Sequence, residues 1–544
     1  MRSDRRTWAS VVGGLALRAA LVAGVVALPA PLVAQAVPAG AKADVVRGVE
    51  ARAKLAQVIN DQLFSYAELG FQERETERYL TALLEKEGFA IDRNVAGLPT
   101  GWVARWTNGT GGPVIAVGSD IDGIPKASQT PGIPWRQPMV DGAPGHGEGH
   151  NSGQAVNIVA ALAAKDWMVR TRTPGTLVIW PGVAEELLGG KAHMVRAGVF
   201  KDVDAALFSH VSSQLSTSWG QPSGTGVVSV EYMFKGESAH SAGAPWRGKS
   251  ALDGVVAMAT GWEMRREHLR PEQRSHYIIS DGGDQPNVVP SEAKIWFYLR
   301  EQSFAAIADM LKTADDIADG AAKMTSTTVS RRLLGSAAIQ HFNRPMAEAA
   351  QVNIGAIGLP RWDADDQAFA KAVQANIKAT VTDGLETKLA ALGPPPAPEA
   401  LKSGGSDDIG DVSWTVPTIT IRYPSNIPGL PGHNWANAIA MATPIAHKGV
   451  QAGAMVMAMT IVDLLTRPRL LADAKAYFRD VQTKNQQYVP VLTKDDAPAT
   501  WLNAEIMARY RPELAKRYYD PQRYGSYLEQ LDVKWPTLGA GTTE

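Results

Sequence analysis

A short glycine-rich segment carries residue types that are well suited to holding a metal ion. The segment Gly145–Asn151 reads GHGEGHN, so that three possible ligands alternate with glycines. In an extended backbone, side chains two positions apart lie on the same side, which would group His146, Glu148 and His150. The glycines leave space for an ion and a substrate. The segment therefore indicates a metal site; the alternative is a surface loop with incidental histidines.

A pair of adjacent carboxylates supplies a second chemical element. Glu185 and Glu186 follow the apolar segment 176–180, which has the pattern of a buried strand. One carboxylate of such a pair can bind a metal ion while the other accepts a proton from the water that the ion activates. Acidic residues are also common at the start of a helix, which is the ordinary alternative. Asp120 and Asp122 follow another apolar segment, where a carboxylate can orient a ligand histidine through its second ring nitrogen.

Two isolated histidines complete a possible ligand set. His210 directly follows the apolar segment 205–208, and His433 follows 418–422 after a loop rich in proline and glycine. A single histidine is more often structural than catalytic. The candidate ligands all fall where predicted strands end, however, and side chains at such positions meet at one edge of a parallel sheet. These candidates are Glu148, His150, Glu186, His210 and His433.

The elements that would position these residues alternate along the chain. Short apolar runs typical of buried strands are separated by stretches with helical spacing of apolar residues. Strands that alternate with helices predict an α/β fold with a mixed, mostly parallel sheet. The predicted strands are 113–117, 176–180, 205–208 and 418–422, and the predicted helices are 44–67, 74–87, 154–170, 187–199 and 441–465.

The segment 222–334 differs in pattern and is predicted to be an α+β domain inserted into the first domain. Partial alternation in 227–234 and a strong strand pattern in 293–300 lie among helical patterns. His240 belongs to this inserted domain, where we expect it to polarise a carbonyl or stabilise an oxyanion, unless it is a solvated residue at a strand end. The other histidines for which we expect structural roles are His193, His268, His276, His341 and His447.

Composition narrows the class of protein. The 544 residues include 54 Lys and Arg against 55 Asp and Glu, so the chain lacks the basic excess that a nucleic-acid partner requires. The absence of cysteine excludes disulfides, cysteine nucleophiles and thiolate metal sites. Hydrophobic residues make up 45% and charged residues 20% of the chain, which argues against global disorder. A large globular enzyme fits these limits.

The N-terminus has the features of an export signal. Three arginines precede an apolar stretch that ends in a small-residue cleavage pattern at 34–36. Arg18 and two prolines interrupt the stretch, which disfavours a membrane anchor. We therefore expect a signal peptide at 1–36 and a periplasmic or secreted mature protein with no stable membrane anchor. The other predicted divisions are a catalytic domain in two parts, 44–221 and 335–467, around the inserted domain 222–334, and a C-terminal extension, 468–544.

Seven short stretches carry a resemblance to a known family. They are Tyr66–Phe71, Gly145–Asn151, Ala184–Glu186, Ser238–Trp246, Pro286–Pro290, Gly410–Trp414 and Pro431–His433. In this order they resemble the aminoacylase/carboxypeptidase-type dinuclear metallopeptidase superfamily, and within it the branch of aminobenzoyl-glutamate utilization protein B. The resemblance covers nearly all of 45–465. It implies a zinc-peptidase-like α/β catalytic domain, with an inserted lid and dimerisation domain, that hydrolyses an amide bond.

The resemblance also implies roles for individual residues of the catalytic domain. Glu185 is expected to be the general base, and Asp122 to orient a metal-bound histidine. Residue 148 is usually a cysteine that bridges the metals in this branch, whereas this chain has Glu148. An oxygen donor shifts the metal preference toward zinc, manganese or cobalt. The implied metal ligands are Glu148, His150, Glu186, His210 and His433.

Three residues of the inserted domain receive roles in the same way. In the family, a lid histidine and an asparagine contact the scissile carbonyl or the carboxylate of the substrate, often across the dimer; His240 and Asn287 match them. Arg300, at the end of a predicted strand, is expected to clamp a substrate carboxylate, because guanidinium pairs with carboxylate through two hydrogen bonds.

The function implied is a metal-dependent amide hydrolase that cleaves a small N-acyl amino acid, similar to aminobenzoyl-glutamate, by means of metal-activated water. We expect one or two divalent ions, Zn²⁺ or Mn²⁺, a small-molecule substrate with a free carboxylate, and a homodimer. One alternative is an exported carboxypeptidase or dipeptidase that acts on short peptides. Another is a non-catalytic binding protein on the same fold, which the presence of Glu185 argues against because a binder needs no general base.

Overall fold

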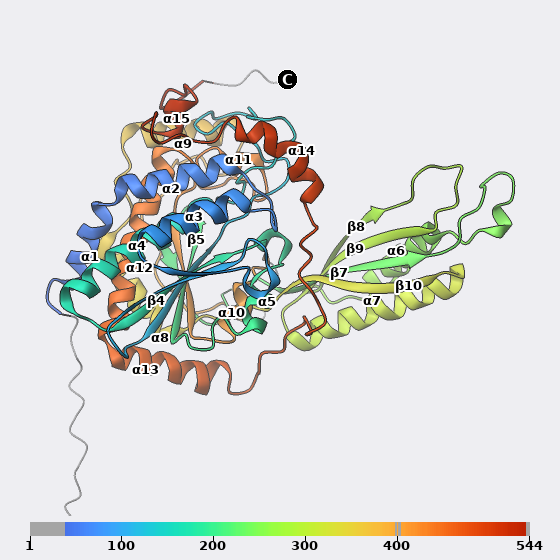
Figure 1. The fold of residues 1–544 in the computed structure, drawn as a ribbon, viewed down its shortest axis with the longest axis horizontal. Helices are drawn as coiled ribbons and strands as arrows, with labels where there is room; N and C mark the ends of the chain where they lie inside the picture. Colours follow the sequence, from blue (N-terminus) through green and yellow to red (C-terminus); the bar gives the residue numbers. More distant parts are fainter. Residues whose placement is uncertain (1–37, 223, 398–399, 401–403, 540–544) are drawn as a thin grey trace, which may run out of the picture. The chain divides into compact units, whose positions relative to one another are not determined.

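The computed structural model describes residues 38–222, 224–397, 400 and 404–539. The predicted signal peptide, 1–36, lies outside these residues. The described chain forms a seven-stranded sheet and a four-stranded sheet (Figure 1). We call the elements from β7 to β10, Gly226–Ala337, the lid domain, and the elements that surround the seven-stranded sheet the catalytic domain.

The seven-stranded sheet is mixed, with its parallel strands in the middle. The strand order is β1-β2-β4-β3-β5-β11-β6. Strand β3 pairs in parallel with β4 and β5, and β11 pairs in parallel with β5, while the pairings toward both edges are antiparallel. All eight residues of β4 are buried, as expected for an inner strand of a sheet that is covered on both faces. The strands are β1 (Ala90–Arg93), β2 (Trp102–Asn108), β3 (Val114–Asp120), β4 (Gly175–Gly182), β5 (Ala205–Ser212), β6 (Ser216–Thr217) and β11 (Thr418–Pro424).

Two long apolar helices, α4 and α12, pack against this sheet and against each other. Helix α12 is long and apolar enough to cross a membrane, but 83% of its most apolar window is buried inside the protein, as in a core helix. The α/β class predicted from the sequence is confirmed. The helices of the catalytic domain are α1 (Ala41–Glu50), α2 (Ala53–Tyr66), α3 (Arg74–Lys86), α4 (Gly153–Thr171), α5 (Lys191–Ala197), α8 (Arg344–Ile357), α9 (Ala364–Asn376), α10 (Ile409–Ser413), α11 (Trp435–Ala438) and α12 (Pro444–Thr466).

The lid domain is an antiparallel sheet in the order β10-β7-β9-β8, with helices α6 and α7 packed against it (Figure 1). Buried residues alternate along β9, and Phe297 and Leu299 join Trp262 of α6 and Ile307 of α7 in one apolar core. The lid elements are β7 (Gly226–Lys235), α6 (Ala251–Arg266), β8 (Arg274–Asp281), β9 (Glu292–Glu301), α7 (Phe304–Thr325) and β10 (Thr328–Ala337).

The C-terminal extension contains α13 (Pro468–Tyr477), α14 (Ala504–Ala515) and α15 (Tyr527–Gln530). It contacts both domains. The hydroxyl of Tyr488 donates to Asp411, beside the point where the lid chain returns to the catalytic domain, and Leu492 enters the apolar core of the lid. Arg511 of α14 pairs with the buried Glu68 of the catalytic domain. The extension therefore ties the lid and the catalytic domain together.

Candidate metal centre and active site

The three neighbouring parallel strands β3, β4 and β5 bring their carboxyl ends to the same edge of the sheet. Asp120 is the last residue of β3, Glu185 and Glu186 follow β4, and His210 lies near the end of β5. His150 lies just before α4, in the loop that follows β3. Side chains from distant parts of the sequence therefore meet at one place because parallel strands end together.

A short turn places the two glutamates. The sequence predicts a helix over 187–199, but Leu188 has a φ of +56° and interrupts it, so α5 begins only at Lys191. Glu185–Leu187 form a separate single turn of 3-10 helix. The backbone N–H of Glu186 donates to Asp122 at 3.1 Å, and that of Ala184 donates to the buried Glu73 at 2.8 Å. These two bonds fix the direction of the turn at the end of β4.

His150 is buried and held by Asp122. Its Nδ1 lies 3.2 Å from the carbonyl oxygen of Asp122 and 3.4 Å from the carboxylate of the same residue. The Nε2 atom is thereby left toward Glu185, at 4.0 Å. Burial lowers the pKa of His150, but the hydrogen bond to Asp122 and the charges of Asp120 and Glu186 outweigh it and raise the pKa to about 10. In the protein alone, the imidazole thus carries the positive charge that these carboxylates attract.

Burial shifts the pKa values of the two glutamates and of His210 in opposite directions. Burial raises the pKa of both Glu185 and Glu186 well above their usual range, and the charge of Asp120 adds to the effect in each case. Burial, together with the charge of Arg422, lowers the pKa of His210 to about 3, so this imidazole is neutral. The Nδ1 atom of His210 lies 2.9 Å from the carbonyl of Val211, which favours a tautomer whose Nε2 is free to bind a metal.

Glu148 and His433 form the outer side of the site. His433 has an exposed side chain, and its Nε2 lies 3.8 Å from Glu148 and 3.7 Å from Glu186. The backbone N–H of His433 also donates to Glu148. The loop before α11 is therefore tied to the glycine-rich segment through this carboxylate.

These residues surround one cavity of about 210 Å³. Among the described residues, a carboxylate oxygen of each of Asp120, Asp122 and Glu186 is buried without a hydrogen-bond partner. Carboxylates and neutral imidazoles around a small cavity are ligands that divalent cations accept. The residues present therefore fit a metal ion. The predicted site residues that line the cavity are Glu148, His150, Glu185, Glu186, His210 and His433.

His146 does not join this group, although strict alternation would place it there. Its Nε2 lies 3.0 Å from the carbonyl of Leu63, on α2. The alternation fails because Gly149 has a φ of +78° and its N–H bonds back to the carbonyl of His146, so the segment is a turn and not a strand.

A second cavity of about 280 Å³ lies between Glu185, Glu186 and the lid strands. Arg300 lines it, as does His276 on β8, for which the sequence indicated only a structural role. The pattern of β8 is too irregular to reveal a strand, since only Ser275 is buried within it. Arg274 is a further basic residue of the lining, and the guanidinium of Arg300 donates to Ser406 at 2.7 Å. This cavity is suited to an anionic group.

His240 and Asn287 lie elsewhere. Both are exposed, and neither is among the residues that line the two cavities. The turn that carries His240 is closed by the N–H groups of Ala242 and Gly243, which donate to its Nδ1 at 3.2 and 3.1 Å. The Ser241 N–H donates to the carbonyl of Asn287 at 3.1 Å, so the two predicted residues belong to one local structure.

Asp120, which the sequence placed with Asp122 as a carboxylate able to orient a histidine, has an oxygen within 4.8 Å of both His150 and His210. Two residues behind the site were not expected from the sequence, Asp407 and Lys191. Asp407 lines the first cavity and has an oxygen within 4.8 Å of Glu185. Lys191 is fully buried and pairs with Asp120 and Asp408. The two adjacent aspartates at 407–408, in a glycine-rich loop, could have indicated Asp407 from the sequence. A single lysine in a predicted helix gave no such indication for Lys191.

Comparisons with known proteins show which proteins this chain is similar to. Residues 224–325 match the family model of the peptidase dimerisation domain. The chain is 33% identical to a p-aminobenzoyl-glutamate hydrolase subunit of Escherichia coli K12 over 462 residues, which are 81% of this chain and 95% of that protein. It is 27% identical to the Xaa-Arg dipeptidase of Mus musculus, over 77% of this chain and 87% of the relative. The crystal structure of an aminobenzoyl-glutamate utilization protein from Klebsiella pneumoniae has the same fold, with a TM-score of 0.52 and 17% identity over 78% of this chain and 98% of that one.

Proposed function

Because the chain belongs to the aminoacylase/carboxypeptidase-type metallopeptidase superfamily, in the branch of this p-aminobenzoyl-glutamate hydrolase, we propose that it hydrolyses N-acyl amino acids that carry a free carboxylate. The chain is a metal-dependent amide hydrolase. The observation that carries the proposal is the convergence of five possible metal ligands and Glu185 around one cavity.

The residues divide into a metal-holding group and a proton carrier. Glu148, Glu186 and His433 would hold a cation on the outer side, and His150 and His210 on the inner side. A divalent cation bound there supplies Lewis-acid chemistry that polarises a carbonyl and makes water nucleophilic at neutral pH. Glu185 is the proton carrier: its carboxylate faces the cavity beside His150, accepts the proton that water gives up and passes it to the leaving amine.

The lining of the second cavity supports an anionic substrate. Arg300 and His276 stand beside Glu185 and Glu186, so a carboxylate held there would place the neighbouring amide near the proton carrier. An aminobenzoyl-glutamate-like compound, in which an acidic amino acid is the leaving group, fits this charge pattern. A substrate with a cationic side chain, of the kind that the name of the Xaa-Arg dipeptidase describes, fits it less well, because Arg274 also lines the cavity.

We further propose Zn²⁺ or Mn²⁺ as the metal, since imidazole and carboxylate suit both ions. We propose a homodimer formed through the lid domain, which is the segment that matches the dimerisation domain. In support of this, β8 is an edge strand with exposed Ile278 and Ile279, a surface that favours association. We also propose that the protein is exported to the periplasm or the medium and that residues 1–36 are removed.

The test is hydrolysis of a panel of N-acyl amino acids by the mature enzyme. The protein is stripped with a chelator and resupplied with Zn²⁺, Mn²⁺ or Co²⁺, and amine release is measured for acidic, neutral and basic leaving groups. We expect turnover only after metal is restored, and the highest kcat/KM with acidic leaving groups. Absence of turnover with every metal and substrate would favour the binding-protein alternative, and a preference for dipeptides would favour the peptidase alternative.

A further inference from the structure

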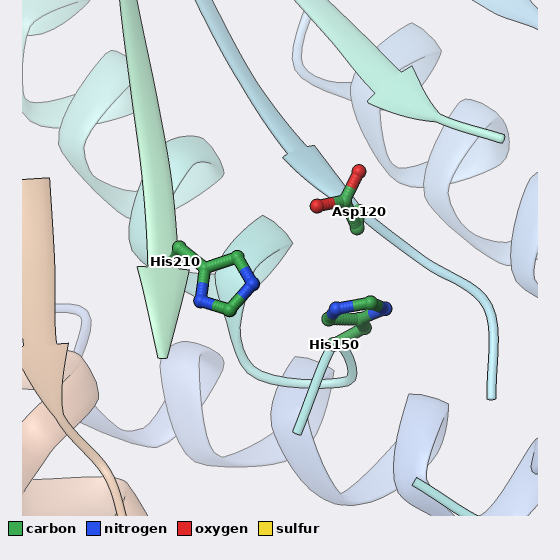
Figure 2. Close-up of side chains that lie close together, drawn as sticks. All are labelled: Asp120, His150 and His210. Carbon is green, nitrogen blue, oxygen red and sulfur yellow. The ribbon is translucent and has the colours of Figure 1, made fainter. Parts of the chain in front are cut away.

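The inner side of the metal centre contains a carboxylate that the predicted ligand set omits. Asp120, Asp122, Glu185 and Glu186 all lie at this edge of the sheet, but only Asp120 has a donor atom grouped with both histidines. The donor atoms of Asp120, His150 and His210 all lie within 4.8 Å of one another. Figure 2 shows the three side chains close together, from β3, from the loop before α4 and from β5.

The outer carboxylate does not take this place. Glu148 contacts His433 through both the side chain and the backbone N–H of that residue. The grouping of Asp120, His150 and His210 does not include Glu148. An imidazole binds a cation only in its neutral form, so His150 and His210 as ligands would leave the charge of a divalent ion uncompensated, and an inner ion needs an anionic ligand next to them.

Lys191 determines which oxygen of Asp120 is available. The ammonium of Lys191 lies 2.5 Å from Oδ1 of Asp120, and both side chains are almost fully buried. The other oxygen, Oδ2, is buried and has no hydrogen-bond partner among the described residues. A buried carboxylate oxygen without a partner is costly, and a cation would satisfy it.

Lys191 is itself held firmly in place. Its ammonium also pairs with Asp408 and lies 3.5 Å from Asp407, and its backbone N–H donates to Asp408 at 3.0 Å. The ammonium further lies 5.0 Å from the centre of the Phe208 ring. Lys191 therefore cannot follow Asp120 if that side chain turns, so the ion pair fixes the direction of the free oxygen.

We propose that Asp120 is a metal ligand, forming an inner subsite with His150 and His210, and that Lys191 is the positioning residue that presents its free oxygen to the ion. The inference rests on the proposed function, since it assumes that the cavity holds a metal. It adds a sixth ligand to the predicted five and assigns them to two subsites, with Glu148, Glu186 and His433 in the outer one.

The first test measures metal binding and not turnover. Zn²⁺ content and affinity are determined by mass spectrometry and calorimetry on the wild-type enzyme, Asp120→Asn and Lys191→Met, and the Co²⁺-loaded proteins are compared by visible absorption. We expect both variants to lose one equivalent of metal or to bind it at least about tenfold more weakly, with a changed cobalt spectrum. The matched control is Asp463→Asn, which weakens the ion pair between the buried Asp463 of α12 and Lys42 of α1, and we expect it to lower stability without changing metal binding.

The second test needs no variant and is decisive if a variant fails to fold. Anomalous diffraction from crystals of the Zn²⁺-loaded wild-type enzyme locates each ion. An ion about 2.0–2.2 Å from an oxygen of Asp120 supports the inference. Ions that all lie beyond about 3 Å from Asp120, or an Asp120→Asn enzyme with unchanged metal content and affinity, would overturn it. A wild-type enzyme that binds no metal at all would instead overturn the proposed function.

Discussion

The candidate site has two halves that the protein holds in different ways. In the catalytic domain, the predicted ligands and Glu185 line one cavity at the ends of strands. In the lid domain, only Arg300 of the predicted residues lines a cavity, while His240 and Asn287 are exposed and line neither cavity. The two halves come from one chain, but only in the first does the structure of that chain bring the predicted residues around one cavity.

The difference follows from what fixes each side chain. Strand ends are set by the hydrogen bonds of a buried sheet, so Glu186 and His210 must lie at the same edge of the sheet, with β3 between their strands, once the strands pair. A turn at the far end of a lid is set only by its own bonds, so the position of His240 relative to the cavity depends on what else is present. Together with the proposed homodimer, this comparison predicts that one copy suffices to bind metal and that two copies are needed for full turnover.

The largest expected effect belongs to the catalytic half. Glu185→Gln removes the proton carrier but preserves the shape of the side chain, so we expect kcat to fall at least about 100-fold. Steady-state kinetics on an N-acyl amino acid measures the loss. The metal content should stay unchanged, because Glu186 and the histidines are intact. A variant that loses its metal together with its activity would show that Glu185 is a ligand and not the base.

The next prediction probes the lid half. His240→Ala removes a group that is expected to stabilise the oxyanion, and we expect kcat to fall by about 100-fold with metal content unchanged. If His240 acts in the partner subunit, co-expression of His240→Ala with Glu185→Gln should restore about a quarter of the wild-type activity, because half of the dimers formed at random would contain one intact site.

The same mixture also distinguishes the opposite case. If His240 and Glu185 of one chain served the same site, every site in the mixture would lack one of them. No activity above that of the separate variants would then appear, and the inference that two copies build the site would be wrong. Analytical ultracentrifugation of the two variants is the control that both still form dimers.

A smaller effect is expected at Arg300, the one predicted lid residue that lines a cavity. Arg300→Met should raise KM for a carboxylate-bearing substrate by about tenfold, with a smaller change in kcat, since a binding interaction is lost. Kinetics with matched acidic and amidated substrates measures it. The control is Arg331→Met on β10, whose guanidinium pairs with Asp315 away from both cavities and which should leave KM unchanged. Equal KM changes in both variants would show a general charge effect.

The catalytic half could be predicted from the sequence because it depends on local patterns. The apolar runs at β3, β4, β5 and β11 are continuous, so strand ends could be located and the residues after them grouped. The glycine-rich segment was less predictable: alternation suggested that His146 would join Glu148 and His150, but the positive φ of Gly149 turns the chain. A single glycine among several does not reveal which one has that conformation.

The remaining residues could not be predicted because they depend on long-range packing. Lys191 meets Asp120 and Asp408 only after β3, α5 and the loop before α10 are assembled, and nothing near Lys191 in the sequence indicates this. His276 reaches the second cavity on β8, an edge strand whose mostly exposed residues show no regular alternation. Edge strands are the hardest to recognise in a sequence, because they pair with a neighbouring strand on one side only and bury less of their surface.

The smallest expected effect concerns the junction that joins the two halves. Asp411 accepts the N–H of Ala338, where the lid chain returns, and the hydroxyl of Tyr488 from the C-terminal extension. Burial raises the pKa of Asp411 from 3.8 to about 7. Between these values the folded protein binds the proton more tightly than the unfolded chain does, so this residue favours folding at low pH and its contribution is lost as the pH rises toward 7.

Asp411→Asn removes this titration while retaining an acceptor for one of the two bonds. We expect the wild-type enzyme to lose more stability than the variant between pH 4 and pH 7, so that their difference in Tm changes by about 2 °C or more over that interval and stays constant above it. Thermal unfolding at matched ionic strength measures the difference. A Tm difference that does not change with pH would show that Asp411 holds the junction as a permanent carboxylate, and that the contact between lid and catalytic domain is insensitive to pH in this range.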